Sequence, residues 1–142
     1  MWYTNIMNCL NCGGETKTRH QIMYCSNTCQ MDYQYKKYIA KWKLGVEDGN
    51  KGISTKNTSR YIKKYLIGKH GECCFICGWN KIHPITKHVP IEMDHIDGNA
   101  ENNNESNLRL ICPNCHALTP HFRNLNKGKG RAWRVKKYLK NK

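Results

Sequence analysis

Apolar residues recur at helical spacing in a first segment, which runs from a Ser26 cap to about Lys43. Gly45 suits the C-terminal end of this helix. The recurring positions form one apolar stripe, made of Met31, Tyr35, Tyr38, Ile39 and Trp42. We expect the stripe to pack in a core, and the alternative is an exposed surface that stacks on bases.

A second helix is predicted from about Thr58 to Lys69, with Gly71 ending it. Tyr61, Tyr65 and Leu66 give this helix one apolar side. Its other positions are rich in basic residues, namely Arg60, Lys63, Lys64 and Lys69. That basic face is either solvated or in contact with phosphate groups.

Farther along the chain, short apolar runs alternate with turn-forming segments. Residues 80–90 contain Pro84 and Pro90 and predict a loop, and residues 91–96 predict a strand. Residues 97–106, D-G-N-A-E-N-N-N-E-S, are strongly turn-forming, and residues 108–111 predict a returning strand. Cys112-Pro113 then opens a short helix with proline at its favoured first position. The predicted order is therefore strand, long loop, strand, helix.

The composition and charge of the chain exclude some classes of protein and favour others. It has 142 residues, of which 39% are hydrophobic, and 24 Lys and Arg against 10 Asp and Glu give a net charge of +14. The length suits one domain or two very small ones, and the core is thin. An apolar run of the roughly 20 residues that a membrane helix needs is absent, and no apolar segment follows the first residues as in a secretory signal. The positive excess favours a polyanionic partner, above all nucleic acid.

Nine cysteines supply the stabilisation that the core lacks. Eight of them form four closely spaced pairs: Cys9 with Cys12, Cys25 with Cys29, Cys74 with Cys77, and Cys112 with Cys115. Such spacing lets two thiolates bind one ion from a tight turn, so the pairs predict two structural zinc sites. Disulfides are the rival interpretation, and they are rare in a reducing cytosol.

The sequence around the cysteine pairs offers alternatives for some of the zinc ligands. After the first pair, Gly13-Gly14 predicts a tight turn, and residues 16–25 predict a short hairpin that leads to the second pair. His20 is an alternative ligand of the first zinc. Cys73 is left over and is either a bystander or an alternative to Cys74.

The segment from Met93 to His116 carries the chemistry. It reads M-D-H-I-D-G-N, then Asn107-Leu108, then L-I-C-P-N-C-H. Within a four-cysteine frame, Asp94-His95, Asn107 and His116 together resemble the HNH endonuclease family, whose core is a ββα-metal finger. The resemblance covers residues 58–131. Within the family, the chain is similar to small phage and bacterial HNH proteins that carry an N-terminal zinc finger.

The resemblance implies a role for each matched residue. Asp94 and His116 would bind a catalytic divalent ion, which is Mg²⁺ or else Mn²⁺ or Ni²⁺, and His95 would be the general base. A histidine suits that role because its unperturbed pKa is about 6.5. Asn107 would tie the long loop in place and so orient His95. The alternatives are a zinc ligand for His116 and a plain turn residue for Asn107.

Three further points of this region remain open in the sequence. Asp97 is expected to form a turn, although it could also touch the metal through water, and His121 either contacts substrate or has no role. Cys115 and His116 are neighbours on a helix and diverge by about 100°, so we expect them to serve different metals. Asp94 and His95 alternate across a strand, so both reach one phosphate only where the strand twists or ends.

We therefore expect a small, zinc-stabilised α+β protein with a ββα-metal core and a preceding treble-clef-like finger. Its parts would be a finger and helix (1–45), a linker (46–57), a nuclease domain (58–122) and a basic tail (123–142). Ten Lys or Arg and no acid follow Ser106. The predicted partner is double-stranded DNA, with no membrane, and the predicted place is the cytoplasm of a bacterial or phage-infected cell. We expect a monomer, with a dimer as the alternative.

The predicted function is metal-dependent hydrolysis of phosphodiester bonds by a homing-type or nicking endonuclease, with restriction or packaging as other roles. A non-catalytic zinc-finger DNA-binding protein is the alternative, and composition alone also permits an RNA-binding or ribosome-associated zinc protein. The DNA-binding alternative would not require Asp94, His95 and His116 together.

Overall fold

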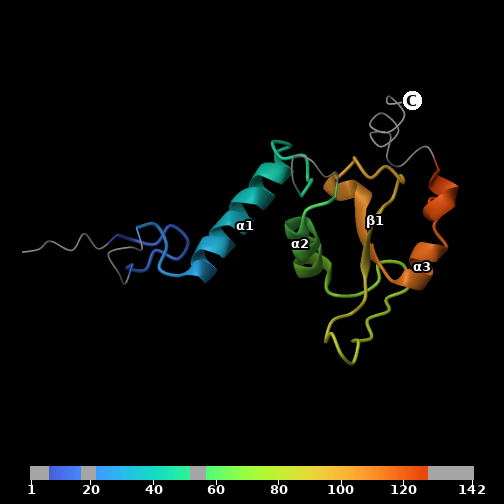
Figure 1. The fold of residues 1–142 in the computed structure, drawn as a ribbon, viewed down its shortest axis with the longest axis horizontal. Coiled ribbons are helices and arrows are strands. Elements are labelled where there is room, and N and C mark those ends of the chain that lie inside the picture. The colour runs from blue at the N-terminus through green and yellow to red at the C-terminus, as the bar shows by residue number, and fades with distance from the viewer. Residues whose placement is uncertain (1–6, 17–21, 52–56, 128–142) are drawn as a thin grey trace, which may run out of the picture. The chain divides into compact units, whose positions relative to one another are not determined.

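A computed structural model describes residues 7–16, 22–51 and 57–127 of the chain (Figure 1). The chain divides into two compact units, Met1–Glu47 and Asp48–Lys142. It is a small α+β protein with a two-stranded sheet. Part of the predicted hairpin at 16–25, the alternative ligand His20, and the part of the basic tail beyond residue 127 lie outside the described residues.

The first unit begins with a tight turn around the first cysteine pair. The Cys9 N–H donates to the Gly14 carbonyl at 2.8 Å, and Asn8 pairs with Glu15 in an antiparallel bridge. Gly13 has a φ of 72°, a left-handed conformation that favours glycine at this turn. Two short extended pieces therefore hold this pair of cysteines at the end of a turn.

Helix α1 (Asn27–Lys43) follows the second cysteine pair. The side chain of Ser26 caps it by accepting the Cys29 N–H at 3.2 Å, and Gly45 follows its last residues with a φ of 72°. The predicted helix is confirmed. Of its apolar stripe, Ile39 and Trp42 are buried, whereas Met31 is 65% exposed. The stripe prediction is wrong for Met31, because burial is confined to the last turns of the helix.

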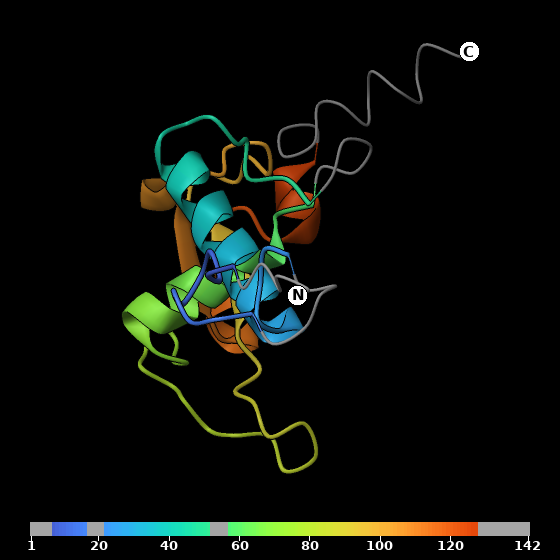
Figure 2. The same ribbon diagram turned by 90° about the vertical axis from the view of Figure 1, so that its left-hand side faces the viewer.

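The second unit contains the sheet and two further helices (Figure 2). Helix α2 (Arg60–His70) precedes strand β1 (Glu92–His95), which pairs antiparallel with β2 (Leu108–Ile111). Helix α3 (Pro113–Ala117) follows directly, and the single turns η1 (Glu105–Asn107) and η2 (Arg123–Asn126) flank the strand and helix. The predicted order of strand, long loop, strand and helix is observed, and the bounds of β2 are those predicted.

Helix α2 packs against β2 and supplies much of the core of this unit. Its buried side chains are Ile62 and Leu66, whereas Tyr61 and Tyr65 are only partly buried. The Tyr65 hydroxyl donates to Glu105 at 3.0 Å. The predicted apolar side is therefore confirmed for Leu66, but it missed Ile62. A tyrosine that keeps a polar partner lies at the edge of the core, and the purely apolar Ile62 lies in its centre.

Residues just before α2 also belong to the second unit. The Ser59 N–H donates to the Gly49 carbonyl at 2.8 Å, and Asn50 and Thr58 form an antiparallel bridge. Gly49 is buried with a φ of 80°, and a Cβ there would lie 2.5 Å from the Cβ of Asn103. Only glycine fits so close to Asn103, which is a residue of the long loop between the strands.

Within the described ranges, no helix is both long and apolar enough to cross a lipid bilayer.

Candidate active site and metal centres

Eight cysteine sulfurs gather in two clusters of four, and in each cluster all sulfurs lie within 4.8 Å of one another. The clusters are Cys9, Cys12, Cys25 and Cys29 in the first unit, and Cys74, Cys77, Cys112 and Cys115 in the second. The recorded Sγ–Sγ distances are 3.4 and 3.6 Å in the first cluster and 3.8 Å in the second. Tetrahedral zinc with Zn–S bonds of about 2.3 Å separates its sulfurs by about 3.8 Å. Both clusters therefore fit structural zinc.

In the first cluster, the pKa values of Cys9 and Cys25 are displaced in opposite directions. The backbone N–H of Cys12 lowers the pKa of Cys9 to about 6. The thiol of Cys29 raises the pKa of Cys25 to about 12. A zinc ion in this place would displace the protons that the sulfurs otherwise exchange.

In the second cluster, the pKa values of Cys74 and Cys115 are likewise displaced in opposite directions. Burial acts to raise the pKa of Cys74, but the backbone N–H groups of Cys77 and Cys112 outweigh it and lower this pKa to about 6. The thiol of Cys77 raises the pKa of Cys115 to about 12. Cys73 stands outside this cluster, because its Sγ lies 3.5 Å from the His70 carbonyl oxygen.

The buried carboxylate of Asp94 lies in the middle of β1, where it is only 7% exposed. Its cross-strand neighbour Arg109 donates from Nε to Oδ2 at 2.8 Å. The second oxygen, Oδ1, lies 3.8 Å from Nε2 of His116. The structure thus brings together the two residues that the sequence predicted as ligands of a catalytic ion. One oxygen and one nitrogen face each other at a separation that a shared cation fits.

Glu92 holds the other side of the His116 ring, in a close contact between its Oε2 and Nδ1. A carboxylate accepts here, so Nδ1 carries the proton and the lone pair of Nε2 is directed toward Asp94. The sequence prediction did not include Glu92. The period of two along a strand could have found it, because Glu92 and Asp94 lie on the same face of β1.

The neighbours Cys115 and His116 serve different groups, as their positions on α3 lead one to expect. Cys115 is part of the second sulfur cluster, whereas His116 contacts Glu92 and lies near Asp94. The ring of Phe122 packs edge-on against His116, with ring centres 5.3 Å apart. Helix α3 therefore joins a structural cluster to the candidate site within two consecutive residues.

His95, the last residue of β1, has a different partner. Its Nε2 lies 3.0 Å from Oδ1 of Asn103, which is 5% exposed. The Nδ2 of Asn103 donates to the Asp48 carbonyl at 3.0 Å, and the Thr58 hydroxyl donates to Oδ1 at 3.0 Å. A carbonyl only accepts, so the Asn103 amide has one orientation. The Nε2 of His95 must then donate, and its Nδ1 keeps the lone pair.

Asn107 fastens the long loop between the strands. Its Oδ1 accepts the Asp97 N–H at 3.0 Å, and its Nδ2 donates to Asp97 Oδ1 and to the Asn102 carbonyl, each at 2.8 Å. Burial acts to raise the pKa of Asp97, but hydrogen bonds from the Asn102 side chain, the Asn99 N–H and Asn107 outweigh it and lower that pKa. The loop thus begins with an ionised turn residue that Asn107 holds directly.

The same loop is packed from outside by His121. Gly98 has a φ of 73°, and a Cβ there would lie 2.5 Å from Cγ of the His121 ring. The Nδ2 of Asn126 donates to the Gly98 carbonyl at 2.7 Å. His121 therefore lies against the loop that follows His95, where a glycine leaves room for it.

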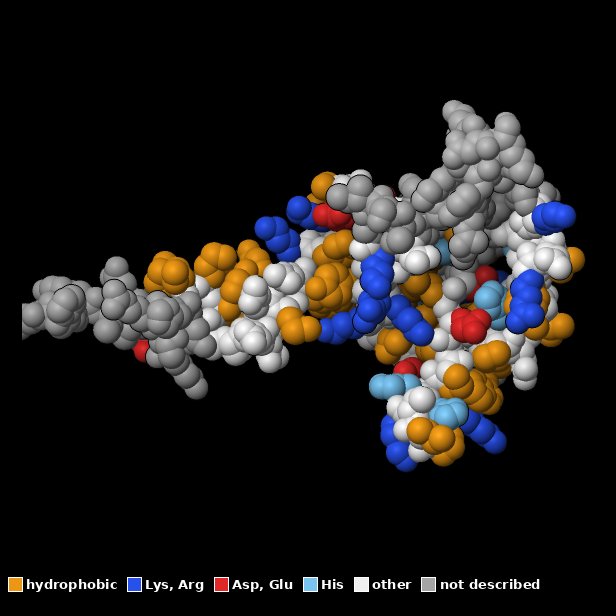
Figure 3. Space-filling view, in the orientation of Figure 1, with side chains coloured by type: hydrophobic (Ala, Val, Ile, Leu, Met, Phe, Trp, Pro, Cys, Tyr) orange, Lys and Arg blue, Asp and Glu red, His pale blue; other side chains and the backbone are white. Residues whose placement is uncertain are grey.

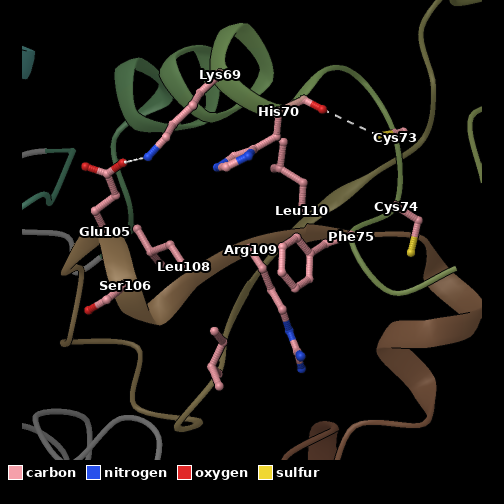
Figure 4. A pocket seen from close by; sticks show the side chains of 11 residues that line it. Lys69, His70, Cys73, Cys74, Phe75, Glu105, Ser106, Leu108, Arg109 and Leu110 are labelled. Atoms are coloured by element: carbon pink, nitrogen blue, oxygen red, sulfur yellow. Dashed lines mark hydrogen bonds and ion pairs between the residues drawn. The ribbon is translucent and has the colours of Figure 1, made fainter. Parts of the chain in front are cut away.

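A separate pocket of about 740 Å³ lies between α2 and β2 (Figure 4). Figure 4 shows Lys69 paired with Glu105 on one side of it and the Arg109 side chain at another. Asp94, His95 and His116 are not among the residues that line it. The candidate site therefore lies outside this pocket.

The chain is similar to the H-N-H endonuclease F-TflIV of Escherichia phage T5, with 35% identity over 97 residues. The match covers 66% of this chain but 40% of the relative, so the chain spans well under half of the relative's length. No protein-family profile and no solved structure matches the chain. The relative nevertheless confirms the resemblance to the HNH endonuclease family that Asp94-His95, Asn107 and C-P-N-C-H indicated.

Proposed function

We propose that this protein is a metal-dependent HNH endonuclease that hydrolyses phosphodiester bonds in double-stranded DNA. The observation that carries the proposal is the buried Asp94 oxygen 3.8 Å from Nε2 of His116, with Glu92 fixing the opposite nitrogen of the ring. A zinc-finger protein that only binds DNA needs no such pair beside its zinc cluster. The phage relative, which is named an H-N-H endonuclease, supports a nuclease function. The homing-type role and the nicking chemistry are proposed from the sequence resemblance alone.

Asp94 and His116 would hold the catalytic divalent ion. They fit it because one buried carboxylate oxygen and one oriented imidazole nitrogen face each other, and Arg109 occupies only the other carboxylate oxygen. When bound, the ion would stabilise negative charge on the phosphate and on the leaving 3′ oxygen. Mg²⁺ prefers oxygen ligands, so the nitrogen of His116 also admits Mn²⁺ or Ni²⁺.

His95 would be the general base. The Asn103 oxygen accepts from Nε2, which leaves the Nδ1 lone pair to take a proton from the attacking water. The Asn103 amide is itself held by Asp48 and Thr58, so the ring is oriented by residues that precede α2. Asn107 acts on the same loop through Asp97 and supports the position of His95 indirectly.

The remaining features suit a DNA substrate. Two zinc ions would hold the sulfur clusters, and the net charge of +14 would draw the protein to phosphate groups. The chain offers one Asp94-His95 pair and one His116, hence one base and one catalytic ion. One chain would therefore cut one strand per encounter and leave 5′-phosphate and 3′-hydroxyl ends.

A supercoiled plasmid tests the proposal, with and without divalent metal. The wild-type protein should give open circle first and linear DNA later, and only with metal. His95→Ala should still bind DNA but cut about 10²–10⁴-fold more slowly, because a positioned base contributes about that factor. His70→Ala, at an exposed histidine of α2, is the matched control and should cut normally.

Two outcomes would contradict the proposal. Normal cutting by His95→Ala would exclude this residue as the base. Tight binding by the wild-type protein without any cutting, whatever the metal, would instead favour the non-catalytic DNA-binding alternative.

A further inference from the structure

A loop of residues 80–90 leaves the second unit between the second sulfur cluster and β1 and projects from it (Figures 1 and 2). Eight consecutive residues of this projecting loop, 81–88, are exposed. Two of them are isoleucines, Ile82 at 65% and Ile85 at 84% exposure. Two large aliphatic side chains are thus exposed on one projection, which offers an apolar surface for binding.

The tip of the projecting loop has a defined shape. The His83 N–H donates to the His88 carbonyl at 2.9 Å, and the Lys87 N–H donates to the His83 carbonyl at 3.0 Å. The Nδ1 of His83 accepts the N–H groups of Ile85 and Thr86, each at 3.2 Å. Lys87 has a φ of 59°, which a residue other than glycine adopts rarely. The tip is therefore closed by its own hydrogen bonds, and Ile85 is carried at its turn.

Both ends of the projecting loop are anchored in the core. Trp79 packs against the buried cluster of Cys74, Ile111 and Cys112, and its carbonyl accepts the Cys74 N–H at 2.8 Å. At the other end Val89 is 6% exposed and Ile91 is 3% exposed, immediately before β1. The loop thus stands on a fixed base that is continuous with the strand of Asp94.

The chemistry of the tip is both apolar and basic. In the sequence, the two isoleucines are flanked by Lys81, His83, Lys87 and His88, and residues 80–90 contain no acid. Figure 3 shows hydrophobic, histidine and basic side chains gathered at this projecting end. The neighbouring acid is Glu72, whose Oε1 lies 3.4 Å from Nδ1 of His88. An aliphatic wedge between cations matches duplex DNA, in which phosphate rows flank an apolar stack of bases.

We propose that the tip of the projecting loop enters a groove of duplex DNA, with Ile85 against the bases and Lys81 and Lys87 against the flanking phosphates. This inference rests on the DNA-binding part of the proposed function, but it does not depend on the catalytic residues. In this proposal, the projecting loop holds the duplex beside the strand that carries Asp94.

Salt-dependent binding to a short duplex separates the two kinds of contact. Ile85→Ser should weaken binding roughly tenfold at every salt concentration, as expected for loss of one buried aliphatic side chain. The double variant Lys81→Gln and Lys87→Gln should lower the slope of log affinity against log salt by about two, since each phosphate contact contributes about 0.9. Leu44→Ser, at an 80% exposed leucine in the other unit, is the control and should bind as the wild type does.

The variants should keep two zinc ions and the wild-type unfolding midpoint, because the replaced side chains are exposed. Wild-type affinity and slope in both loop variants would overturn the inference. Wild-type DNA affinity together with reduced self-association of the loop variants in sedimentation would assign the loop to a protein partner, and this too would overturn the inference. If the wild-type protein binds DNA without cutting it, while Ile85→Ser binds more weakly, the catalytic proposal fails and this inference stands.

Discussion

The two histidines of the candidate site lie in regions that are built differently. His116, on α3, contacts the carboxylate of Glu92, and its free nitrogen faces a second carboxylate, Asp94. His95, at the end of β1, contacts the neutral amide of Asn103. A carboxylate partner makes an imidazole a stronger ligand for a cation, whereas an amide fixes the tautomer without adding charge. The difference suits a metal ligand in the first region and a proton acceptor in the second.

The regions also differ in what supports them. The helix of His116 is capped by Cys112, whose Sγ accepts the Cys115 N–H at 3.4 Å, so a residue of the sulfur cluster defines its first turn. His95 is followed instead by a loop held by amide side chains, chiefly Asn103 and Asn107. The first region is therefore held by a sulfur cluster and the second by a hydrogen-bond network.

The largest effect should come from disrupting the sulfur cluster beside His116. Cys112→Ser should lose one zinc ion and all cleavage, because a structural zinc contributes on the order of 10 kcal/mol to the folding of its site. Cys25→Ser, in the other cluster, should also lose one zinc ion but keep cleavage, with weaker DNA binding. Elemental analysis and the plasmid assay measure both properties, and equal cleavage by the two variants would remove the distinction between the clusters.

An intermediate effect should follow when the carboxylate partner of His116 becomes an amide. Glu92→Gln should raise the metal concentration for half-maximal cleavage by about 10–100-fold, the usual cost of losing a residue that orients a metal ligand. Glu72→Gln, which alters the contact with exposed His88, is the matched control. A metal titration of the cleavage rate gives the answer, and an unchanged midpoint for Glu92→Gln would remove Glu92 from the site.

The smallest effect should come from the reverse exchange, in which the amide partner of His95 becomes a carboxylate. Asn103→Asp should favour the protonated ring, so the acidic limb of the pH–rate profile should move upward by about one pH unit. The rate above that limb should remain near the wild-type value. Asn104→Asp, at an exposed neighbour in the same loop, is the control. Equal profiles for the two variants would show that Asn103 does not act on the base.

Much of this architecture was predictable because local patterns determine it. The run at 108–111 predicted β2 residue for residue, and Pro113 placed the start of α3 correctly. The prediction for α2 found the buried Leu66 but missed Ile62, because Tyr61 and Ile62 are both apolar in a pattern of period 3.6. Which of the two is buried depends on the strand that packs against the helix, and the helix sequence does not contain that information.

The site was predictable for its motif residues and not for their partners. Arg109 contacts Asp94 only because of the strand register, which has no signature in either residue. Asn103 lies in a run of three asparagines, and nothing in the run distinguishes it from its neighbours. Its role depends on Asp48 and Thr58, which lie 55 and 45 residues away in the sequence.

The most direct test of the division between a metal ligand and a base is a metal titration of single-turnover cleavage by His116→Ala and His95→Ala. High Mn²⁺ should restore cleavage to His116→Ala, because mass action offsets a lost ligand. No metal concentration should restore His95→Ala, whereas added imidazole should, since it replaces the missing proton acceptor. Metal rescue of His95→Ala together with failure of His116→Ala to respond would contradict the assignment of the two histidines.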